Sequence, residues 1–330
     1  MMERLPIRFC GTGAYVPEHV LTNRHFENYL DTSNEWIVTR TGIRERRRVA
    51  PDECTSTMSI NAAQRALEDA GMTADEIDVI ICATATPDCP TPATASFIQV
   101  GLGAKDIPAF DVGAACAGFI HAMIVAVGLM NVGLYKRPLV IGAETLTRFA
   151  DPQDRNMIVL FGDAAGAAIL APAENSGQGI LYCDMGCDGT RTRDICAPAG
   201  GSRLPTSETT VAERLQFLRM RGREVYKFAV LKMQKLISNA MTQAGLTPDD
   251  LKLVIPHQSN LRIIESVSER VGLPMEKFAV NIDRYGNTSA ASVILSLDEA
   301  RRDGTLQTGD HVILVAIGAG LCWGTMVLRL

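Results

Sequence analysis

The chain has 330 residues, a net charge of −5, 47% hydrophobic residues and 21% charged residues. This composition is typical of a globular protein with a sizeable core, and the negative charge argues against a general nucleic-acid binder. The first residues lack the pattern of a signal peptide, and no apolar run is long enough to predict a membrane span. The nine cysteines, an odd number, fit reduced thiols better than a disulfide framework. We therefore expect a cytoplasmic protein without membrane contact.

A unit of helix, glycine turn and apolar strand occurs twice along the chain. Residues 66–82 read ALEDAGMTADEIDVIIC, and residues 240–256 read AMTQAGLTPDDLKLVIP. In each copy a glycine, Gly71 or Gly245, follows the helix, and an acidic turn leads into the strand. The two glycines are 174 positions apart, about half the chain. This spacing predicts a duplicated α/β unit.

The same offset relates two loops of small residues further along. DVGAACAGF (111–119) falls opposite YGNTSAASV (285–293), and each loop leads into an apolar helix and then a strand. Strands that alternate with helices predict a mostly parallel sheet in each half. We place the halves at residues 1–174 and 175–330, packed around a pseudo-dyad. Because open α/β sheets bind ligands at the carboxyl ends of their strands, the two loops are expected to share one site.

Cys116 lies in the first of these loops, after the apolar strand AFDV (109–112) and at the start of a helix. The thiol of a free cysteine titrates near pH ~8.5, and the N-terminus of a helix lowers this pKa. Such a thiolate is a candidate nucleophile. The alternative is a small buried hydrophobic residue, because free cysteines are commonly buried.

Three further stretches carry groups suited to carbonyl chemistry. His257 follows an apolar strand in VIPHQSN (254–260), and Asn287 lies in RYGNTSAAS (284–292). The glycine-rich turn AIGAGLCWGT (316–325) can present backbone N–H groups. Taken singly, these are also the features of a capping histidine, a turn asparagine and a strand corner. Together with a nucleophile they indicate acyl transfer onto sulfur, followed by stabilisation of an enolate.

AACAGF (114–119), PHQSN (256–260) and YGNTSAAS (285–292) closely resemble the active-site motifs of β-ketoacyl-[acyl-carrier-protein] synthase III. That family comprises initiating condensing enzymes of thiolase fold. The resemblance extends from GTGAYVPE (11–18) to WGT near the C-terminus, essentially the whole chain. It implies a thiolase-like α/β fold, with duplicated halves in a layered αβαβα arrangement. It also implies an acyltransferase of fatty acid biosynthesis that uses acyl-CoA and malonyl-[acyl-carrier-protein] (malonyl-ACP).

The resemblance implies a role for each catalytic residue. Cys116 would take the acyl group as a thioester, while His257 and Asn287 would hold the malonyl thioester carbonyl and stabilise the enolate formed on loss of CO2. The backbone N–H groups of Cys116 and Ala319 would form an oxyanion hole. The family often shows a phenylalanine and three glycines where this chain has Ile317, Gly318, Ala319 and Gly320. No cofactor and no metal are implied.

The resemblance also implies how substrates bind. The CoA-binding residues would be Thr32, Trp36, Arg40, Arg155, Gly222, Asn260 and Arg262, with the adenine on Trp36. Lys227, Arg262 and Arg270 are candidates for docking the acidic acyl carrier protein, which a basic patch would steer. We expect a solvated basic loop for the arginines at 44 and 46–48.

A homodimer is implied as well. In this family the segment TPDCPTPAT (86–94) crosses the dimer interface and closes the acyl pocket of the partner. Cys89, a small residue, stands where a bulkier one is often found, and this predicts a pocket deep enough for medium-chain primers. The sequence alone does not name the primer or the pathway.

Three alternative functions remain open from the sequence alone. A related synthase III-like acyltransferase or ketosynthase of a secondary-metabolite pathway would keep the same three catalytic residues. A degradative thiolase would need a second reactive cysteine, for which Cys322 is a candidate, but it would not pair its histidine with an asparagine such as Asn287. A non-catalytic acyl-CoA-binding protein should have lost at least one of Cys116, His257 and Asn287.

Overall fold

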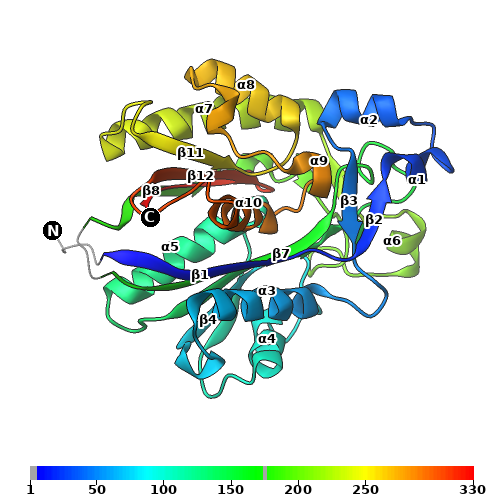
Figure 1. The fold of residues 1–330 in the computed structure, drawn as a ribbon. Helices are drawn as coiled ribbons and strands as arrows, with labels where there is room; N and C mark the ends of the chain where they lie inside the picture. Colours follow the sequence, from blue (N-terminus) through cyan, green and yellow to red (C-terminus); the bar gives the residue numbers. More distant parts are fainter. Residues whose placement is uncertain (1–5, 174–176) are drawn as a thin grey trace.

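Two copies of one α/β unit are stacked on each other in this chain (Figure 1). The computed structural model describes residues 6–173 and 177–330, so the predicted boundary between residues 174 and 175 lies outside the described residues. Each unit has one central sheet, with helices between the two sheets and on their outer faces (Figure 1). The predicted layered α/β fold is confirmed.

The first sheet contains five strands, and the second contains four. The strands of the first are β1 (Ile7–Tyr15), β4 (Val79–Ala83), β5 (Ala109–Val112), β6 (Pro138–Thr145) and β7 (Asp163–Pro172). They lie in the order β1-β7-β6-β4-β5. The strands of the second are β8 (Gly179–Cys187), β11 (Leu251–Pro256), β12 (His311–Gly318) and β13 (Cys322–Arg329). They lie in the order β11-β12-β13-β8.

The expectation of a mostly parallel sheet in each half is wrong, because both sheets are mixed. β4 is parallel to β5 and β6, and β11 is parallel to β12. The pairs β6–β7, β1–β7, β12–β13 and β13–β8 are antiparallel. A parallel pair needs a crossover of a dozen or more residues, whereas only residues 319–321 join β12 to β13. The chain therefore turns straight back at this point.

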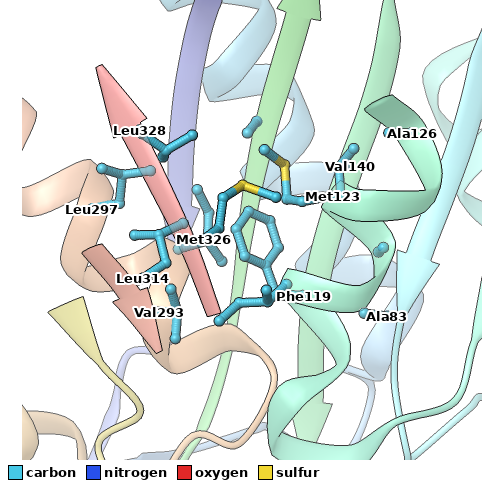
Figure 2. Packing of buried hydrophobic residues seen from close by; sticks show 14 of the residues in the cluster. Ala83, Phe119, Met123, Ala126, Val140, Val293, Leu297, Leu314, Met326 and Leu328 are labelled. Atoms are coloured by element: carbon cyan, nitrogen blue, oxygen red, sulfur yellow. The ribbon is translucent and has the colours of Figure 1, made fainter. Parts of the chain in front are cut away.

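Six long helices complete the layers. α5 (Gly118–Asn131) and α10 (Ala291–Arg302) lie between the sheets, α3 (Thr55–Ala70) and α4 (Thr94–Leu102) cover the first sheet, and α7 (Gly222–Ala244) and α8 (Leu261–Val271) cover the second (Figure 1). Figure 2 shows Phe119 and Met123 of α5 beside Leu314 and Met326 of the second sheet. Full burial of each such side chain contributes about 1.5–3 kcal/mol to the stability of the fold.

No helix among the described residues combines the length and apolar composition needed to cross a membrane.

A smaller lateral region packs beside the layers (Figure 1). It includes α1 (Asn23–Glu27), α2 (Asn34–Thr41), α6 (Glu208–Ala212), β2 (His19–Thr22) and β3 (Glu45–Arg48). The remaining short elements are β9 (Ile195–Cys196), β10 (Arg219–Met220) and α9 (Ile282–Tyr285).

Arg46 corrects the expectation of a solvated basic loop, because its side chain is fully buried. Its guanidinium donates to the carbonyl oxygens of Leu21 and Val159 and to Asn23 Oδ1. A guanidinium has five N–H donors in a fixed plane, so one side chain can satisfy three acceptors at once. Arg46 thereby ties the β2–β3 hairpin to the segment that precedes β7.

The internal repeat places the two small-residue loops against each other. Gly71 and Gly245 end α3 and α7 in the same left-handed conformation, with φ of 62° and 67°. Gly118 opens α5, and a Cβ atom built there would lie 3.6 Å from Cβ of Ala290, the residue that precedes α10. The loops before α5 and α10 therefore meet between the two sheets. The exact limits of the two halves stay a prediction.

Candidate active site

Cys116 lies in a short 3-10 turn, η2 (Ala115–Ala117), between β5 and α5. The helix proper begins two residues after the cysteine, at Gly118, so Cys116 stands just ahead of its N-terminus. Cys116 is half-buried.

The pKa of the Cys116 thiol is raised to about 12, mainly because burial disfavours the thiolate. The nearby Glu144 and Cys322 raise it further, while the hydrogen bond from Ser289 lowers it. The expectation of a lowered pKa is therefore wrong for this site without substrate. The thiol is protonated at neutral pH, and its attack on a thioester requires a proton acceptor.

His257 follows β11 directly, and its backbone N–H donates to the carbonyl of Val315 at 2.8 Å. The side chain is 2% exposed, and burial lowers its pKa to about 3, so the imidazole is neutral. Nδ1 lies 2.7 Å from Ser292 Oγ. Within the described part of the chain, Nε2 has no hydrogen-bond partner although it is shielded from solvent. A buried nitrogen of this kind is suited to bind a substrate atom.

Asn287 is held by its backbone and by its side-chain oxygen. Its backbone N–H donates to the carbonyl of Leu160 at 2.8 Å, and its carbonyl accepts from Gly162 at 3.1 Å. Its Oδ1 accepts the backbone N–H of Ser289 at 2.9 Å. Because Oδ1 is fixed in this way, the Nδ2 amide and its two N–H groups are oriented away from the loop backbone.

Ser289 joins the three predicted catalytic residues, and the sequence analysis did not single it out. Its hydroxyl lowers the pKa of the Cys116 thiol, its N–H donates to Asn287 Oδ1, and its carbonyl accepts at 2.8 Å from Ser292 Oγ, which lies beside His257. Ser289 has φ of 48°, a left-handed conformation that serine adopts rarely and that marks functional sites. The run TSAAS offered a signal, since a small-residue loop with three hydroxyls is unusual before an apolar helix.

Glu144, at the end of β6, is a second residue beside the predicted site that the sequence analysis did not single out. It is fully buried, and its Oε1 accepts from Ser289 Oγ at 3.0 Å. The only signal in the sequence was a lone acidic residue in the otherwise apolar strand PLVIGAET, which marks an unusual buried carboxyl group but not its partners.

The glycine-rich turn lies directly against the nucleophile. A Cβ atom at Gly318 would sit 2.6 Å from the Ala114 carbonyl and 2.9 Å from the Cys116 nitrogen. Cys322, at the start of β13, donates its thiol to the carbonyl of Ala114 at 3.1 Å. The structure thus brings residues 318–322 beside Cys116, where backbone N–H groups such as that of Ala319 could bind an oxyanion.

Trp36, Arg40 and Arg155 come together at the surface, although Arg155 is far from the other two in sequence. The guanidinium carbons of Arg40 and Arg155 lie 4.9 Å and 5.3 Å from the centre of the Trp36 ring. Arg155 also pairs with Asp31 at 2.9 Å. An indole face flanked by two guanidinium groups is a suitable surface for a purine and its phosphates.

The remaining predicted CoA-binding residues surround this group. Asn260 caps α8 and donates from Nδ2 to the Arg40 carbonyl at 3.0 Å. Among the described residues, Thr32 Oγ1 is buried and has no hydrogen-bond partner. Gly222 opens α7 with open space around its Cα, and Arg262 is exposed in the first turn of α8.

Lys227, Arg262 and Arg270 are all exposed on α7 and α8, which lie side by side (Figure 1). The two helices are linked by Tyr226, whose hydroxyl lies 2.8 Å from Ser266 Oγ. Lys227 also borders a surface hollow with Lys232, Lys235 and Arg191. The outer surface of these helices is therefore locally basic on a chain of negative net charge.

Over residues 6–173 and 177–330, no three or more histidine, cysteine, aspartate or glutamate side chains gather in a way that could hold a metal ion. The described cysteines at positions 10, 54, 82, 89, 116, 187, 196 and 322 form no disulfide bond.

Comparisons with known proteins extend over the whole chain. The family described as 3-oxoacyl-[acyl-carrier-protein] synthase III matches residues 110–189, and its C-terminal counterpart matches residues 241–330. A β-ketoacyl-[acyl-carrier-protein] synthase III of Symbiobacterium thermophilum is 50% identical over 328 residues, which cover 99% of each chain.

Solved structures agree with these matches. A 3-oxoacyl-[acyl-carrier-protein] synthase III from Aquifex aeolicus has 41% identity and a TM-score of 0.90, covering 98% of this chain and 100% of that one. A priming β-ketosynthase of the R1128 polyketide pathway has 36% identity and a TM-score of 0.91, covering 100% and 98%.

Proposed function

The chain belongs to the β-ketoacyl-[acyl-carrier-protein] synthase III family, the condensing enzymes that initiate fatty acid synthesis, and we propose that it acts through an acyl thioester on Cys116. In this reaction an acyl-CoA primer and malonyl-ACP give β-ketoacyl-ACP and CO2. One observation supports the assignment of residues above all others: Ser289 is hydrogen-bonded to Asn287 and, through Ser292, to His257, and its hydroxyl lowers the pKa of the Cys116 thiol.

The first half-reaction transfers the acyl group. The Cys116 sulfur attacks the thioester carbon of acyl-CoA, the bond from that carbon to the CoA sulfur breaks, and CoA leaves as a thiol. Negative charge develops on the carbonyl oxygen in the transition state. The backbone N–H groups of Cys116 and Ala319 are our candidates for binding it, because fixed donors in a shielded site need no reorganisation.

The second half-reaction is a decarboxylation followed by carbon–carbon bond formation. Loss of CO2 from malonyl-ACP leaves an enolate whose oxygen requires hydrogen-bond donors. Asn287 Nδ2 supplies one donor. His257 Nε2 supplies the other in the tautomer that carries its proton on Nε2, for which the Ser292 hydroxyl, 2.7 Å from Nδ1, turns from the Ser289 carbonyl to Nδ1. The enolate carbon then attacks the acyl carbon, and Cys116 leaves as a thiolate.

The CoA moiety binds at Trp36 in this proposal, with Arg40 and Arg155 on its phosphates and adenine. Replacing Trp36 by alanine is expected to raise KM for acyl-CoA about tenfold, because aromatic and cation–π contacts contribute roughly 1–1.5 kcal/mol. The value of kcat should stay within about twofold, since the ring lies outside the reacting group.

An acyl-pantetheine primer, which lacks the adenine nucleotide, is the control for this variant. Its KM should be the same for the wild type and Trp36→Ala. An equal increase in KM for both primers would mean that the substitution disturbs the pocket and that Trp36 does not bind adenine.

The partners of the enzyme are proposed on structural grounds. Lys227, Arg262 and Arg270 offer positive charge to the acidic carrier protein.

A homodimer is favoured because β5 is the edge strand of the first sheet, and α4 beside it exposes Phe97 and Val100 by 39% and 80%. Sedimentation equilibrium should give a molecular mass twice that of one chain. Cysteines outside disulfide bonds, such as Cys10, Cys54 and Cys82, support a reducing, cytoplasmic location. The absence of a cofactor stays a prediction.

Reconstitution with purified malonyl-ACP and a series of acyl-CoA primers tests the proposed function. We expect β-ketoacyl-ACP and one CO2 for each CoA released. With Cys89 half-buried in the segment that would close the partner's pocket, we expect octanoyl-CoA to be used as well as acetyl-CoA. A strong preference for acetyl-CoA would contradict the deep pocket, and release of CoA without β-ketoacyl-ACP would contradict condensation.

A priming synthase of a secondary-metabolite pathway is the second candidate. The similarity to the R1128 priming β-ketosynthase over the whole chain favours it. The same reconstitution separates the two candidates if it contains both the carrier protein of fatty acid synthesis and a polyketide carrier protein. Faster condensation with the polyketide carrier protein would support the second candidate.

A further inference from the structure

Cys187 and Cys322 stand opposite each other at one end of the second sheet. Cys187 is the last residue of β8, Cys322 is the first residue of β13, and the two are register partners in this antiparallel pair. Among the paired strand residues that the structure describes, no other two cysteines are partners in this way. Cross-strand partners carry their side chains on the same face of a sheet, so the two thiols are neighbours.

The hydrogen bonds beside this pair define its geometry. Asp188 and Leu321, the next pair along, exchange both of their backbone hydrogen bonds, at 2.9 Å and 3.2 Å. Hydrogen-bonded and non-hydrogen-bonded pairs alternate along an antiparallel ladder, so Cys187 and Cys322 form a non-hydrogen-bonded pair. In such a pair the Cα atoms are about 4.5 Å apart. That separation lies within the range of about 4.4–6.8 Å that a disulfide bond spans.

The side chains show the same proximity at Gly320, in the turn before β13. A Cβ atom built at Gly320 would lie 3.7 Å from Cys187 Sγ and 4.0 Å from Cys322 Cβ. Cys187 Sγ also lies 3.8 Å from the Gly320 carbonyl oxygen. Both side chains thus border the same glycine. Closure of a disulfide bond therefore requires a change of side-chain rotamer and no change of strand register.

Cys322 connects this pair to the candidate active site. Its thiol lies 3.1 Å from the carbonyl oxygen of Ala114 and 3.2 Å from that of Ala319, and it donates to both. Ala114 belongs to the loop that carries Cys116, and Ala319 belongs to the turn that we propose for the oxyanion hole. A disulfide bond removes the thiol proton, so both carbonyl groups would lose this donor.

We propose that Cys187 and Cys322 are an oxidisable dithiol, which hydrogen peroxide closes to a disulfide bond that slows acylation of Cys116. The disulfide bond itself does not depend on the function proposed above, whereas its effect on acylation rests on that function. Reduction by a small dithiol such as dithiothreitol reopens the pair and restores the rate.

The oxidation takes place in two balanced steps. Cys187 is exposed, so its sulfur attacks peroxide first. The O–O bond breaks, the sulfur becomes a sulfenic acid, and one water is released. The Cys322 sulfur then attacks the sulfur of this sulfenic acid, the S–S bond forms, and the hydroxyl group leaves with the Cys322 proton as a second water. The two sulfurs together lose two electrons, which peroxide takes up.

Burial explains why the exposed thiol reacts before the nucleophile does. The pKa of the Cys116 thiol is raised to about 12 and that of Cys322 to about 11, in both cases mainly by burial. Because peroxide oxidises thiolates, both of these thiols react slowly at neutral pH. The disulfide bond between Cys187 and Cys322 is therefore expected to form while Cys116 stays reduced.

The location of the disulfide bond in full-length protein is the first part of the test. Reduced protein is exposed to hydrogen peroxide, its remaining thiols are blocked with N-ethylmaleimide under denaturing conditions, and intact mass and a non-reducing peptide digest are recorded. We expect two fewer maleimide groups than on the reduced protein, and one linked pair of peptides that contains Cys187 and Cys322. A linkage of Cys322 to Cys116, or no linkage, would overturn the proposal.

The single-turnover rate of Cys116 acylation by acyl-CoA, on the same samples, is the second part. The oxidised wild type should be at least about tenfold slower than the reduced wild type, because a small displacement of a catalytic group is costly. Dithiothreitol should restore the rate. Cys187→Ser should acylate at the wild-type rate when reduced and should keep that rate after the same peroxide treatment. An equal loss of rate in Cys187→Ser would show that peroxide acts on Cys116 directly.

Cys183→Ser is the matched control, because Cys183 is also exposed on β8 but stands opposite Met326. This variant should form the disulfide bond and lose acylation as the wild type does. Protection by Cys183→Ser would assign the oxidised thiol to Cys183 and contradict the pair. Cys322→Ser, which keeps a hydroxyl donor beside the Ala114 carbonyl, should form no linkage at Cys187.

The outcomes separate this inference from the proposed function. A Cys187–Cys322 disulfide bond that leaves the acylation rate unchanged would overturn the effect on acylation, and the proposed function would stand. If the reduced wild type takes up no acyl group at Cys116, the proposed function fails. The peptide digest still decides in that case whether the two thiols form a pair.

Discussion

Asn287→Ala is expected to lower malonyl-ACP decarboxylation and condensation by about 100- to 1,000-fold, the usual effect of removing one fixed oxyanion donor. Acylation of Cys116 should change by less than about tenfold, because Asn287 acts on the second carbonyl. The two half-reactions are separated by measuring CoA release without malonyl-ACP, and CO2 release with it.

Asn287→Asp is the matched control for this result. Aspartate keeps the shape and the oxygen that accepts the Ser289 N–H at 2.9 Å, but it has no N–H to donate. It should therefore decarboxylate malonyl-ACP as slowly as Asn287→Ala. A rate near that of the wild type for Asn287→Asp would show that the amide N–H is not the donor.

Gly318→Ala is expected to reduce the acylation rate about 100-fold and to destabilise the fold by about 1–3 kcal/mol. The added Cβ atom would lie 2.6 Å from the Ala114 carbonyl and 2.9 Å from the Cys116 nitrogen, so one of these backbone segments must move. Both belong to the loop that carries the nucleophile and its N–H donor. Single-turnover acylation and thermal unfolding measure the two effects.

Gly128→Ala provides the comparison for this substitution. Gly128 lies on the exposed side of α5, and nothing lies within 4 Å of a Cβ atom built there. Alanine should stabilise the helix by about 0.5–1 kcal/mol and leave acylation unchanged. Equal activity of Gly318→Ala and Gly128→Ala would contradict the close approach of the 318–322 turn to Cys116.

Much of the architecture could be predicted from local pattern and from the repeat. The glycines at 71 and 245 marked equivalent helix ends, and both have the left-handed conformation that a helix C-cap requires. The offset between them indicated that the loops before α5 and α10 would meet. Strand direction could not be read in the same way, because an apolar strand has the same pattern in parallel and antiparallel pairs.

The site could be predicted where a residue type itself suggests chemistry. Cys116, His257 and Asn287 stood out in this way. The structure links Asn287 and His257 through Ser289 and Ser292, in the loop that meets the start of α5 beside Cys116. Ser289, Ser292 and Glu144 were missed, because serine is common in loops and a single acidic residue in a strand says nothing of its partners. Their importance follows from contacts between residues about 145 positions apart, such as Ser289 with Glu144.

The pKa of Cys116 could not be predicted from the local sequence either. Its position before a helix predicted a lowered pKa, yet the pKa is raised to about 12. Desolvation depends on how completely the second half of the chain covers the loop, and local sequence carries no measure of that coverage.

Intact-mass measurement of the purified protein with acyl-CoAs of two to twelve carbons tests the central claim most directly. The account predicts that the wild type gains the mass of one acyl group and that Cys116→Ala gains none, and the primer that loads best identifies the chain length preferred. An acyl group of equal mass on Cys116→Ala, or no acyl group on the wild type with any primer, would contradict it.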